Sequence, residues 1–306
     1  MLLDQFKSFY YRNYPEDMES AIELFSIFGG LDIAIDVSKQ KEALIHEHIL
    51  KNFSFLEQYI TKLLLNHKNA MRLLQALAVS DRKIFSAFKR AKLNNQNGGV
   101  ALHFLQKRNL VGIEHSREQD KRELKPKLSK EEAKYRISDK FFILYPFLRF
   151  WFYFVYPHAK EIVQGKYKTF FEEYQLKKYT YSSLVFEELS QILLNYHLQD
   201  EVIETIGSYW DANSEIDILA VTQKQHIYVA ECKWTNHKIN KKELNKLLEK
   251  CTVMGIEPTQ LVLFSKRGFS KELVAMKDSF LTLYSVEDFI LLVKTKPMKM
   301  VFPLSL

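Results

Sequence analysis

From residue 181 to its end, the chain alternates between the helical period of about 3.6 residues and the strand period of two. Helices are predicted at 182–198, 241–254, 270–277 and 286–293, and strands at 201–209, 215–222, 226–234, 260–265 and 281–285. The order α-β-β-β-α-β, with a further β-α pair, predicts a mixed sheet flanked by helices. Only Gln223-Lys224-Gln225 separates the second strand from the third, so we expect these two to form an antiparallel hairpin.

Length and composition exclude several classes of protein. The 306 residues are 47% hydrophobic and include only 9 glycines and 7 prolines, which is typical of a packed, helix-rich globular protein and not of a disordered or fibrous one. Two cysteines, Cys232 and Cys251, are too few and too isolated for a disulfide framework or a four-ligand zinc site. With no secretory leader pattern at the N-terminus, we expect a reducing, cytoplasmic location. The most apolar run, 141–156, is shorter than the roughly 20 residues that span a bilayer, so no membrane partner is expected.

The net charge of +7 is concentrated in one segment. Residues 67–140 hold 18 Lys and Arg against 8 Asp and Glu, whereas residues 1–66 and 181–306 are slightly acidic and 141–180 slightly basic. A basic block in an otherwise near-neutral chain is what a protein that binds phosphate backbones needs. The alternative is a solvated basic loop with no ligand.

The basic segment has the element order of a winged helix. Three short helices are predicted at 70–79, 82–92 and 100–108, with the Asn- and Gly-rich residues 94–99 as a turn into the third. Two strand-like runs then flank a basic loop between 113 and 137. We expect the third helix and the wing to contact DNA, through His103, Gln106, Lys107, Arg108, Arg117, Lys121, Arg122, Lys125 and Lys127. The alternative interpretation is a winged helix that contacts only other proteins, and the sequence does not distinguish the two.

The segments on either side of the basic block read as helical. Residues 141–157 are aromatic on every helical face, which favours a buried helix that joins two domains over a base-stacking surface. Residues 16–28 and 44–65 have helical spacing and are separated by Gly29-Gly30.

Three charged residues on the predicted strands point to chemistry. Asp217 interrupts an apolar strand, where a carboxylate is costly unless something pairs with it. On the next strand, Glu231 and Lys233 share a face, while Cys232 points to the opposite, packed face. Two carboxylates and an amine therefore converge at one end of a hairpin, a set that suits Mg²⁺ or Mn²⁺ and phosphodiester hydrolysis. The alternative is a buried ion-pair network without turnover.

This stretch resembles the PD-(D/E)xK nuclease superfamily, in which an Asp on the second strand precedes a (D/E)-x-K on the third. The matching residues are Asp217 and Glu231-Cys232-Lys233, and Ile216 stands where a proline often precedes the Asp. The resemblance implies a restriction-endonuclease-like core with Mg²⁺ or Mn²⁺ as cofactor. It also implies a glutamate from the first helix as a further metal ligand, Glu187 first and Glu188 second.

A wider resemblance is to the C-terminal half of archaeal-type ATPases with a DUF234 domain. It rests on Tyr135–Asp139, Phe147–Pro157, Phe186-Glu187, Tyr209-Trp210 and Glu215–Ala220. In that family an ATPase core precedes a helical lid, a winged helix and a nuclease-like domain. This chain has no Gly-x-x-x-x-Gly-Lys-Ser/Thr, so no ATP hydrolysis is expected and a separate ATPase becomes a candidate partner.

Together these patterns predict an α+β multidomain protein with four parts. These are a helical lid-like region at 1–66, a winged-helix DNA-binding domain at 67–140, an aromatic helical connector at 141–180 and a nuclease-like α/β domain at 181–306. The expected function is metal-dependent DNA endonuclease, with metal ligands Asp217, Glu231 and Glu187 and with Lys233 assisting the attacking water. Cutting both strands with one active site per chain would require a homodimer or two nicks. The alternative function is a catalytically silent DNA-binding or regulatory protein.

Overall fold

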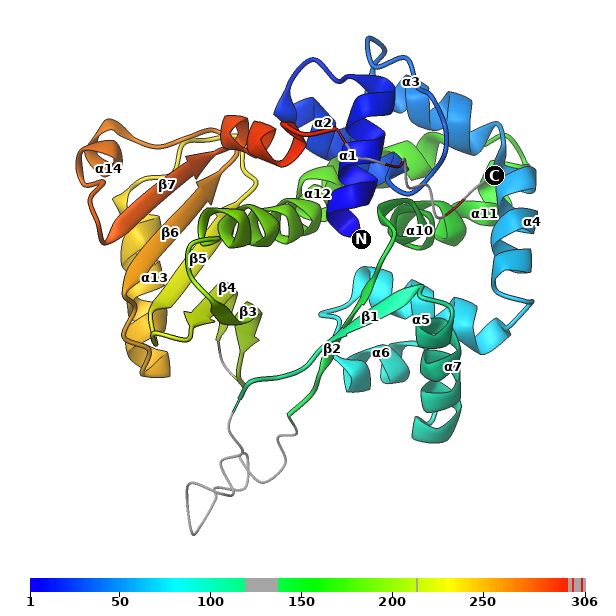
Figure 1. The fold of residues 1–306 in the computed structure, drawn as a ribbon. Coiled ribbons are helices and arrows are strands. Elements are labelled where there is room, and N and C mark those ends of the chain that lie inside the picture. The colour runs from blue at the N-terminus through cyan, green and yellow to red at the C-terminus, as the bar shows by residue number, and fades with distance from the viewer. Residues whose placement is uncertain (119–136, 213, 297–298, 300–303, 305–306) are drawn as a thin grey trace. The chain divides into compact units, whose positions relative to one another are not determined.

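The structure is a computed structural model, and it describes residues 1–118, 137–212, 214–296, 299 and 304 (Figure 1). The chain forms two compact units. Unit 1 comprises Met1–Glu114, Asp139–Tyr181 and Thr295–Leu306, and unit 2 comprises His115–Ser138 and Ser182–Lys294. Helices together with a mixed five-stranded sheet confirm the predicted α+β class.

Unit 1 is mainly helical. Its helices are α1 (Leu2–Asn13), α2 (Met18–Phe28), α3 (Lys41–Ile45), the π-helix η1 (His46–Leu50), α4 (Phe53–Leu63), α5 (Lys68–Val79), α6 (Ile84–Arg90), α7 (Asn95–Lys107), α10 (Pro146–Phe150), the π-helix η2 (Trp151–Val155), the 3₁₀-helix η3 (Tyr156–His158), α11 (Ala159–Val163) and the first part of α12 (Lys168–His197). The helix expected at 44–65 is divided among α3, η1 and α4. In the described part of the chain, no helix has an apolar stretch long enough to cross a bilayer.

The aromatic run forms the core of unit 1. Phe150, Phe152 and Phe154 are each 0% exposed, and the ring of Trp151 stacks on Phe53 with centroids 5.3 Å apart. The Tyr181 hydroxyl donates to two main-chain carbonyls, Ser26 O at 2.9 Å and Pro146 O at 3.1 Å. A helix that is apolar all round is thus buried among other helices.

Three helices and a two-stranded antiparallel sheet follow one another in the basic segment. After α5, α6 and α7 come β1 (Val111–Glu114) and β2 (Lys140–Ile143), paired from Val111↔Ile143 to Glu114↔Lys140. The second strand runs from Lys140 to Ile143, so the expectation of a helix from 141 was wrong at this point. Residues 135 and 136 of the strand-like run expected up to 137 lie outside the described residues. Pairing with β1 determines the conformation, because a short apolar run fits either a helix or a strand.

The Asn- and Gly-rich residues 94–99 are not the expected turn but the start of α7. The Asn94 side chain accepts a hydrogen bond from Asn97 N at 2.8 Å, so it caps the helix N-terminus. A Cβ on Gly98 would lie 2.7 Å from ring carbons of Phe88, so only glycine lets α7 pack against α6 this closely. The cap and this tertiary contact override the weak helix propensity of the segment.

Unit 2 contains the mixed sheet, in the order β3-β4-β5-β6-β7. Its elements are β3 (Ile203–Trp210), β4 (Glu215–Thr222), β5 (Ile227–Lys233), α13 (Lys241–Met254), β6 (Gln260–Ser265), α14 (Lys271–Ala275), β7 (Leu281–Ser285), the 3₁₀-helix η4 (Val286–Val293) and the second part of α12. The pairs β3–β4 and β4–β5 are antiparallel, and β5–β6 and β6–β7 are parallel. The predicted element order and the predicted hairpin are both confirmed.

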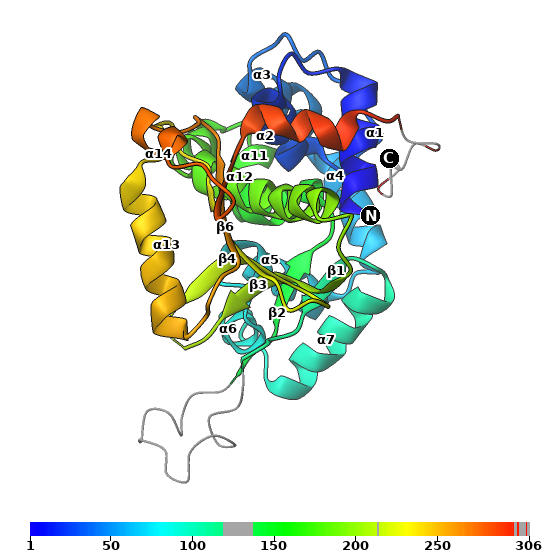
Figure 2. The same cartoon turned by 60° about the vertical axis from the view of Figure 1, so that its left-hand side comes forward.

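Helices cover both faces of this sheet (Figure 2). On one face, Leu247 and Cys251 of α13 pack with Val229 and Leu263. On the other face, the ring centroid of Phe186 on α12 lies 4.8 Å from Trp234 and 5.0 Å from Phe289 of η4. Alternate residues of β5 therefore face different helices, and charged residues on the α13 face are placed beside α13.

Candidate functional site

The register of β4 and β5 brings the two strand carboxylates together. The last paired residues are Ile218 and Ala230, and one step further along the antiparallel hairpin places Asp217 opposite Glu231. Both side chains then project to the same face as Val229, the face that α13 covers. Asp217 Oδ2 also accepts a hydrogen bond from Cys232 N at 2.7 Å, which fixes its carboxylate at the end of the hairpin.

Glu231 is the centre of a group of ion pairs. Its side chain is only 9% exposed, and its two oxygens have different partners. Glu231 Oε1 accepts from Lys233 Nζ at 2.5 Å, and Oε2 accepts from Lys250 Nζ at 2.7 Å. Lys233 Nζ also lies 3.7 Å from Glu243 Oε2. We call Asp217, Glu231, Lys233, Glu243 and Lys250 the carboxylate–lysine cluster.

The sequence analysis missed the two members of this cluster that come from α13. Glu243 and Lys250 lie seven residues apart, which is two helical turns, so they share one side of the helix. Next to them, Leu244, Leu247 and Cys251 form the buried side that packs on the sheet. Charged residues bordering the apolar stripe of a sheet-covering helix were a signal that could have identified both.

The electrostatics of the cluster reflect first the burial of its side chains and second the closeness of its two strand carboxylates. Burial and then the negative charge of Glu231 raise the pKa of Asp217 from 3.8 to about 6, against the opposing effects of Cys232 N–H, Lys250 and Lys233. Burial lowers the pKa of Lys233, but the attraction of Glu231 outweighs it and the net shift is upward. A hydrogen bond from Lys246 lowers the pKa of Glu243. A cation beside Asp217 and Glu231 would relieve their repulsion.

Glu187, the predicted third metal ligand, comes from α12 on the other face of the sheet. Its neighbour Phe186 packs against Trp234 there, and Cys232 also faces this side, as expected. Burial raises the pKa of the Cys232 thiol, with smaller contributions from Asp217 and Glu187. Among the described residues, no three His, Cys, Asp or Glu side chains are grouped so that they could hold a metal ion. The ligand set Asp217, Glu231 and Glu187 therefore stays a prediction.

The donor chemistry of the cluster nevertheless fits a hard divalent cation. Mg²⁺ is usually held by one or two carboxylates and keeps several waters, so a third protein ligand is not required. Asp217 and Glu231 are two such carboxylates, and the negative charge of Glu231 contributes, after burial, to the raised pKa of Asp217. They are the residues that would hold the ion.

The predicted DNA-contacting residues fall in three places. On α7, His103, Lys107 and Arg108 at its C-terminal end are exposed and Gln106 is partly buried. Arg117 belongs to unit 2, where its guanidinium donates to three main-chain carbonyls, Leu219 O at 3.1 Å, Gly207 O at 2.9 Å and Ser208 O at 2.8 Å. These bonds attach its segment to β3 and β4. The remaining four, Lys121, Arg122, Lys125 and Lys127, lie outside the described residues.

Fold and cluster together define unit 2 as an α/β domain whose mixed sheet carries two acidic residues and a lysine at the end of an antiparallel hairpin. Residues 151–247 match the family DUF234, described as archaea bacterial proteins of unknown function. The matched range includes Glu187, Asp217, Glu231 and Lys233, and it confirms the DUF234 part of the resemblance. No curated protein and no solved structure matched the chain.

Proposed function

We propose that the protein is a metal-dependent DNA endonuclease whose active site is the carboxylate–lysine cluster. The observation that carries the proposal is the juxtaposition of Asp217 and Glu231 on adjacent strands with the Lys233 ammonium 2.5 Å from Glu231. Two carboxylates and an amine at one end of a sheet are the groups that phosphodiester hydrolysis requires. The helices α5, α6 and α7 with β1 and β2 serve as a winged-helix domain that binds DNA, which the basic charge of 67–140 supports.

Each member of the cluster has a separate part in this chemistry. Asp217 and Glu231 would hold Mg²⁺ or Mn²⁺, and the bound ion would supply Lewis-acid polarisation of the scissile phosphate. Lys233 keeps its proton at neutral pH, because its pKa is raised, and Nζ donates a hydrogen bond that orients the attacking water. Lys250 Nζ donates a hydrogen bond to the second oxygen of Glu231 at 2.7 Å, so this buried carboxylate has a cationic partner from α13.

A catalytically silent DNA-binding or regulatory protein is the second candidate, and one observation favours it. Both oxygens of Glu231 already have lysine partners, Lys233 on the same strand and Lys250 on α13, and the second of these ion pairs connects β5 to α13. In this alternative the cluster is only structural, and the nuclease-like domain is an interaction module.

Incubation of the purified protein with supercoiled plasmid separates the two candidates. With Mg²⁺ or Mn²⁺ we expect nicked and then linear DNA, and with EDTA we expect none, because the proposed chemistry needs the cation. The products are resolved on an agarose gel. Intact plasmid with both metals, combined with a salt-dependent gel shift, would support the silent alternative, and cleavage in EDTA would contradict the metal dependence.

Neutralising the basic end of α7 should weaken DNA binding. The double variant Lys107→Gln, Arg108→Gln removes two exposed cations. The slope of log affinity against log salt concentration should therefore become less negative by up to about 1.8, which is about 0.9 for each lost phosphate contact. Fluorescence anisotropy with a labelled duplex measures this slope. The double variant Lys224→Gln, Lys277→Gln removes the same charge from exposed positions of unit 2 and serves as control. Equal slopes for both variants would exclude α7 from the DNA interface.

A further inference from the structure

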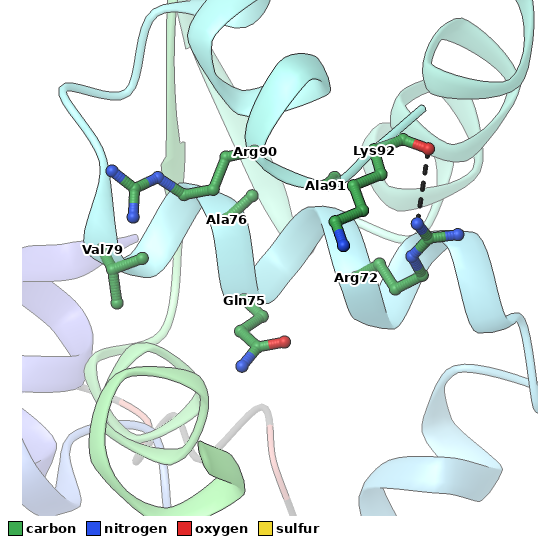
Figure 3. Close-up of a pocket in the computed structure, with 7 residues that line it drawn as sticks. All are labelled: Arg72, Gln75, Ala76, Val79, Arg90, Ala91 and Lys92. Carbon is green, nitrogen blue, oxygen red and sulfur yellow. Dashed lines mark hydrogen bonds between the residues drawn. The ribbon is translucent and has the colours of Figure 1, made fainter. Parts of the chain in front are cut away.

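A surface pocket lies between α5 and the end of α6 in unit 1 (Figure 3). Its volume is about 420 Å³, and its lining consists of Arg72, Gln75, Ala76, Val79, Arg90, Ala91 and Lys92. The α5 residues follow the spacing i, i+3, i+4 and i+7, so one face of that helix forms one wall. The end of α6 and the turn after it form the opposite wall.

The lining combines cations with a small apolar floor. Arg72, Arg90 and Lys92 supply three positive charges, Gln75 supplies an amide, and the remaining three residues are alanines and a valine. There is no carboxylate among the lining residues. The sequence around the pocket is also strongly basic, since residues 68–92 contain seven Lys and Arg but only one acidic residue, Asp81. The pocket is therefore suited to an anion.

Backbone geometry holds the cations at the pocket. Arg72 Nη2 donates to Lys92 O at 3.3 Å, so the arginine of α5 is connected to the turn after α6 (Figure 3). Lys92 has φ 52°, in the left-handed region where glycine or asparagine usually ends a helix. A lysine at this position costs about 1 kcal/mol of backbone strain relative to glycine. Favourable interaction with the helix dipole accounts for a cation in the last turn of α6, but not for Arg72, which comes from α5.

We propose that this pocket binds the phosphate group of a nucleotide-sized phosphorylated ligand. Guanidinium groups pair with phosphate oxygens through two parallel hydrogen bonds, and Lys92 adds a point charge. Ala76, Val79 and Ala91 provide the less polar surface for the body of the ligand. The volume lies within the range of small-molecule sites, about 300–1,000 Å³, and exceeds what a single phosphate fills. The same phosphate chemistry is available from two sources, a free nucleotide and a nucleic-acid strand.

Calorimetric titration of the full chain with adenosine 5′-monophosphate, adenosine and inorganic phosphate tests this proposal, and anisotropy with a labelled DNA duplex tests the second source. The pocket variant Arg90→Gln, Lys92→Gln removes two lining charges. Its matched control is Lys68→Gln, Lys89→Gln, which removes the same charge from exposed positions of the same two helices that do not line the pocket. A second variant, Lys92→Gly, removes the amine but relieves the positive φ, so loss of binding cannot be attributed to unfolding.

We expect the monophosphate to bind and adenosine not to bind, with affinity at least about tenfold lower in the pocket variant and unchanged in the control. Lys92→Gly should be at least as stable as wild type and yet bind more weakly. If only the duplex binds, and if the pocket variant but not the control weakens that binding, the pocket does recognise phosphate and the phosphate comes from nucleic acid. Equal binding of adenosine and the monophosphate, or equal effects of pocket and control variants, would overturn the proposal. The nucleotide titration involves neither cleavage nor DNA, so its outcome is independent of both the nuclease and the DNA-binding parts of the proposed function.

Discussion

Replacing Asp217 by Asn is expected to reduce metal-dependent DNA cleavage about a thousandfold while leaving the fold and DNA binding intact. A bound cation supplies several kcal/mol to phosphodiester hydrolysis, and each 1.36 kcal/mol corresponds to a factor of about ten in rate. The amide keeps the shape of the side chain, and its oxygen can still accept the hydrogen bond from Cys232 N. Only the negative charge that would hold the cation is removed. Plasmid nicking measures the cleavage, and a gel shift measures the binding.

The same variant should be more stable than wild type in EDTA at neutral pH. The pKa of Asp217 is about 6 in the folded protein, above its ordinary 3.8, so between pH 4 and pH 6 the native state binds more protons than the unfolded state. The free energy of unfolding of wild type therefore falls as pH rises through this window. Asn does not ionise, so the variant escapes a penalty of up to about 3 kcal/mol. Urea denaturation at pH 4 and pH 7 measures the difference.

Asp278→Asn is the matched control for both measurements. Asp278 is an exposed carboxylate that accepts hydrogen bonds from two main-chain groups, Phe280 N and Leu281 N, each at 2.8 Å, and it lies outside the cluster. This change should leave cleavage unaltered. Undiminished cleavage by the Asp217 variant would show that the cluster is not the active site. A variant less stable than wild type at pH 7 would show that the ionised carboxylate is favourably placed.

The strand part of the cluster was predictable because it depends on local rules. Period-two alternation places Glu231 and Lys233 on one face, and the short connection between β4 and β5 predicts the hairpin that brings Asp217 beside them. The α13 part depends on how that helix crosses β5. The positions of Glu243 and Lys250 beside the apolar stripe of α13 mark both as neighbours of the sheet, but which strand residue each one meets depends on the orientation in which the helix packs.

The errors in the fold have the same origin. Residues 94–99 read as a turn because Asn and Gly are weak helix formers, yet the cap by Asn94 and the close packing of Gly98 on Phe88 make them helical. The strand β2 lies in an aromatic run with no clear period, and its pairing with β1, which is distant in sequence, determines its conformation. At Gly98 and in β2, tertiary contacts decided the conformation where the local pattern was ambiguous.

Replacing Glu231 by Gln should abolish cleavage to a similar extent but change stability in the opposite direction. The side chain of Glu231 is 9% exposed, and its two oxygens accept hydrogen bonds from Lys233 and Lys250. Without its charge, the ammonium of Lys250 loses its counter-ion, while that of Lys233 still has Glu243 Oε2 at 3.7 Å. Breaking a buried ion pair typically costs about 3 kcal/mol. We therefore expect a lower free energy of unfolding at pH 7, measured by urea denaturation in EDTA, together with loss of plasmid nicking.

The pH dependence of the stability lost in Glu231→Gln follows from Lys233, whose pKa is raised in the folded protein. A raised lysine pKa contributes stability that is fully present below its unfolded value of about 10.4 and is lost as pH rises through the folded value. The difference in the free energy of unfolding between wild type and Glu231→Gln should thus persist at pH 7 and become smaller above about pH 10.

Lys250→Met, which leaves Glu231 paired with Lys233, should lower the free energy of unfolding by less than Glu231→Gln does. If Asp217→Asn and Glu231→Gln shift stability in opposite directions while both abolish nicking, loss of fold cannot explain the loss of cleavage. If Glu231→Gln is as stable as wild type, the ion pair between Glu231 and Lys250 does not hold β5 to α13.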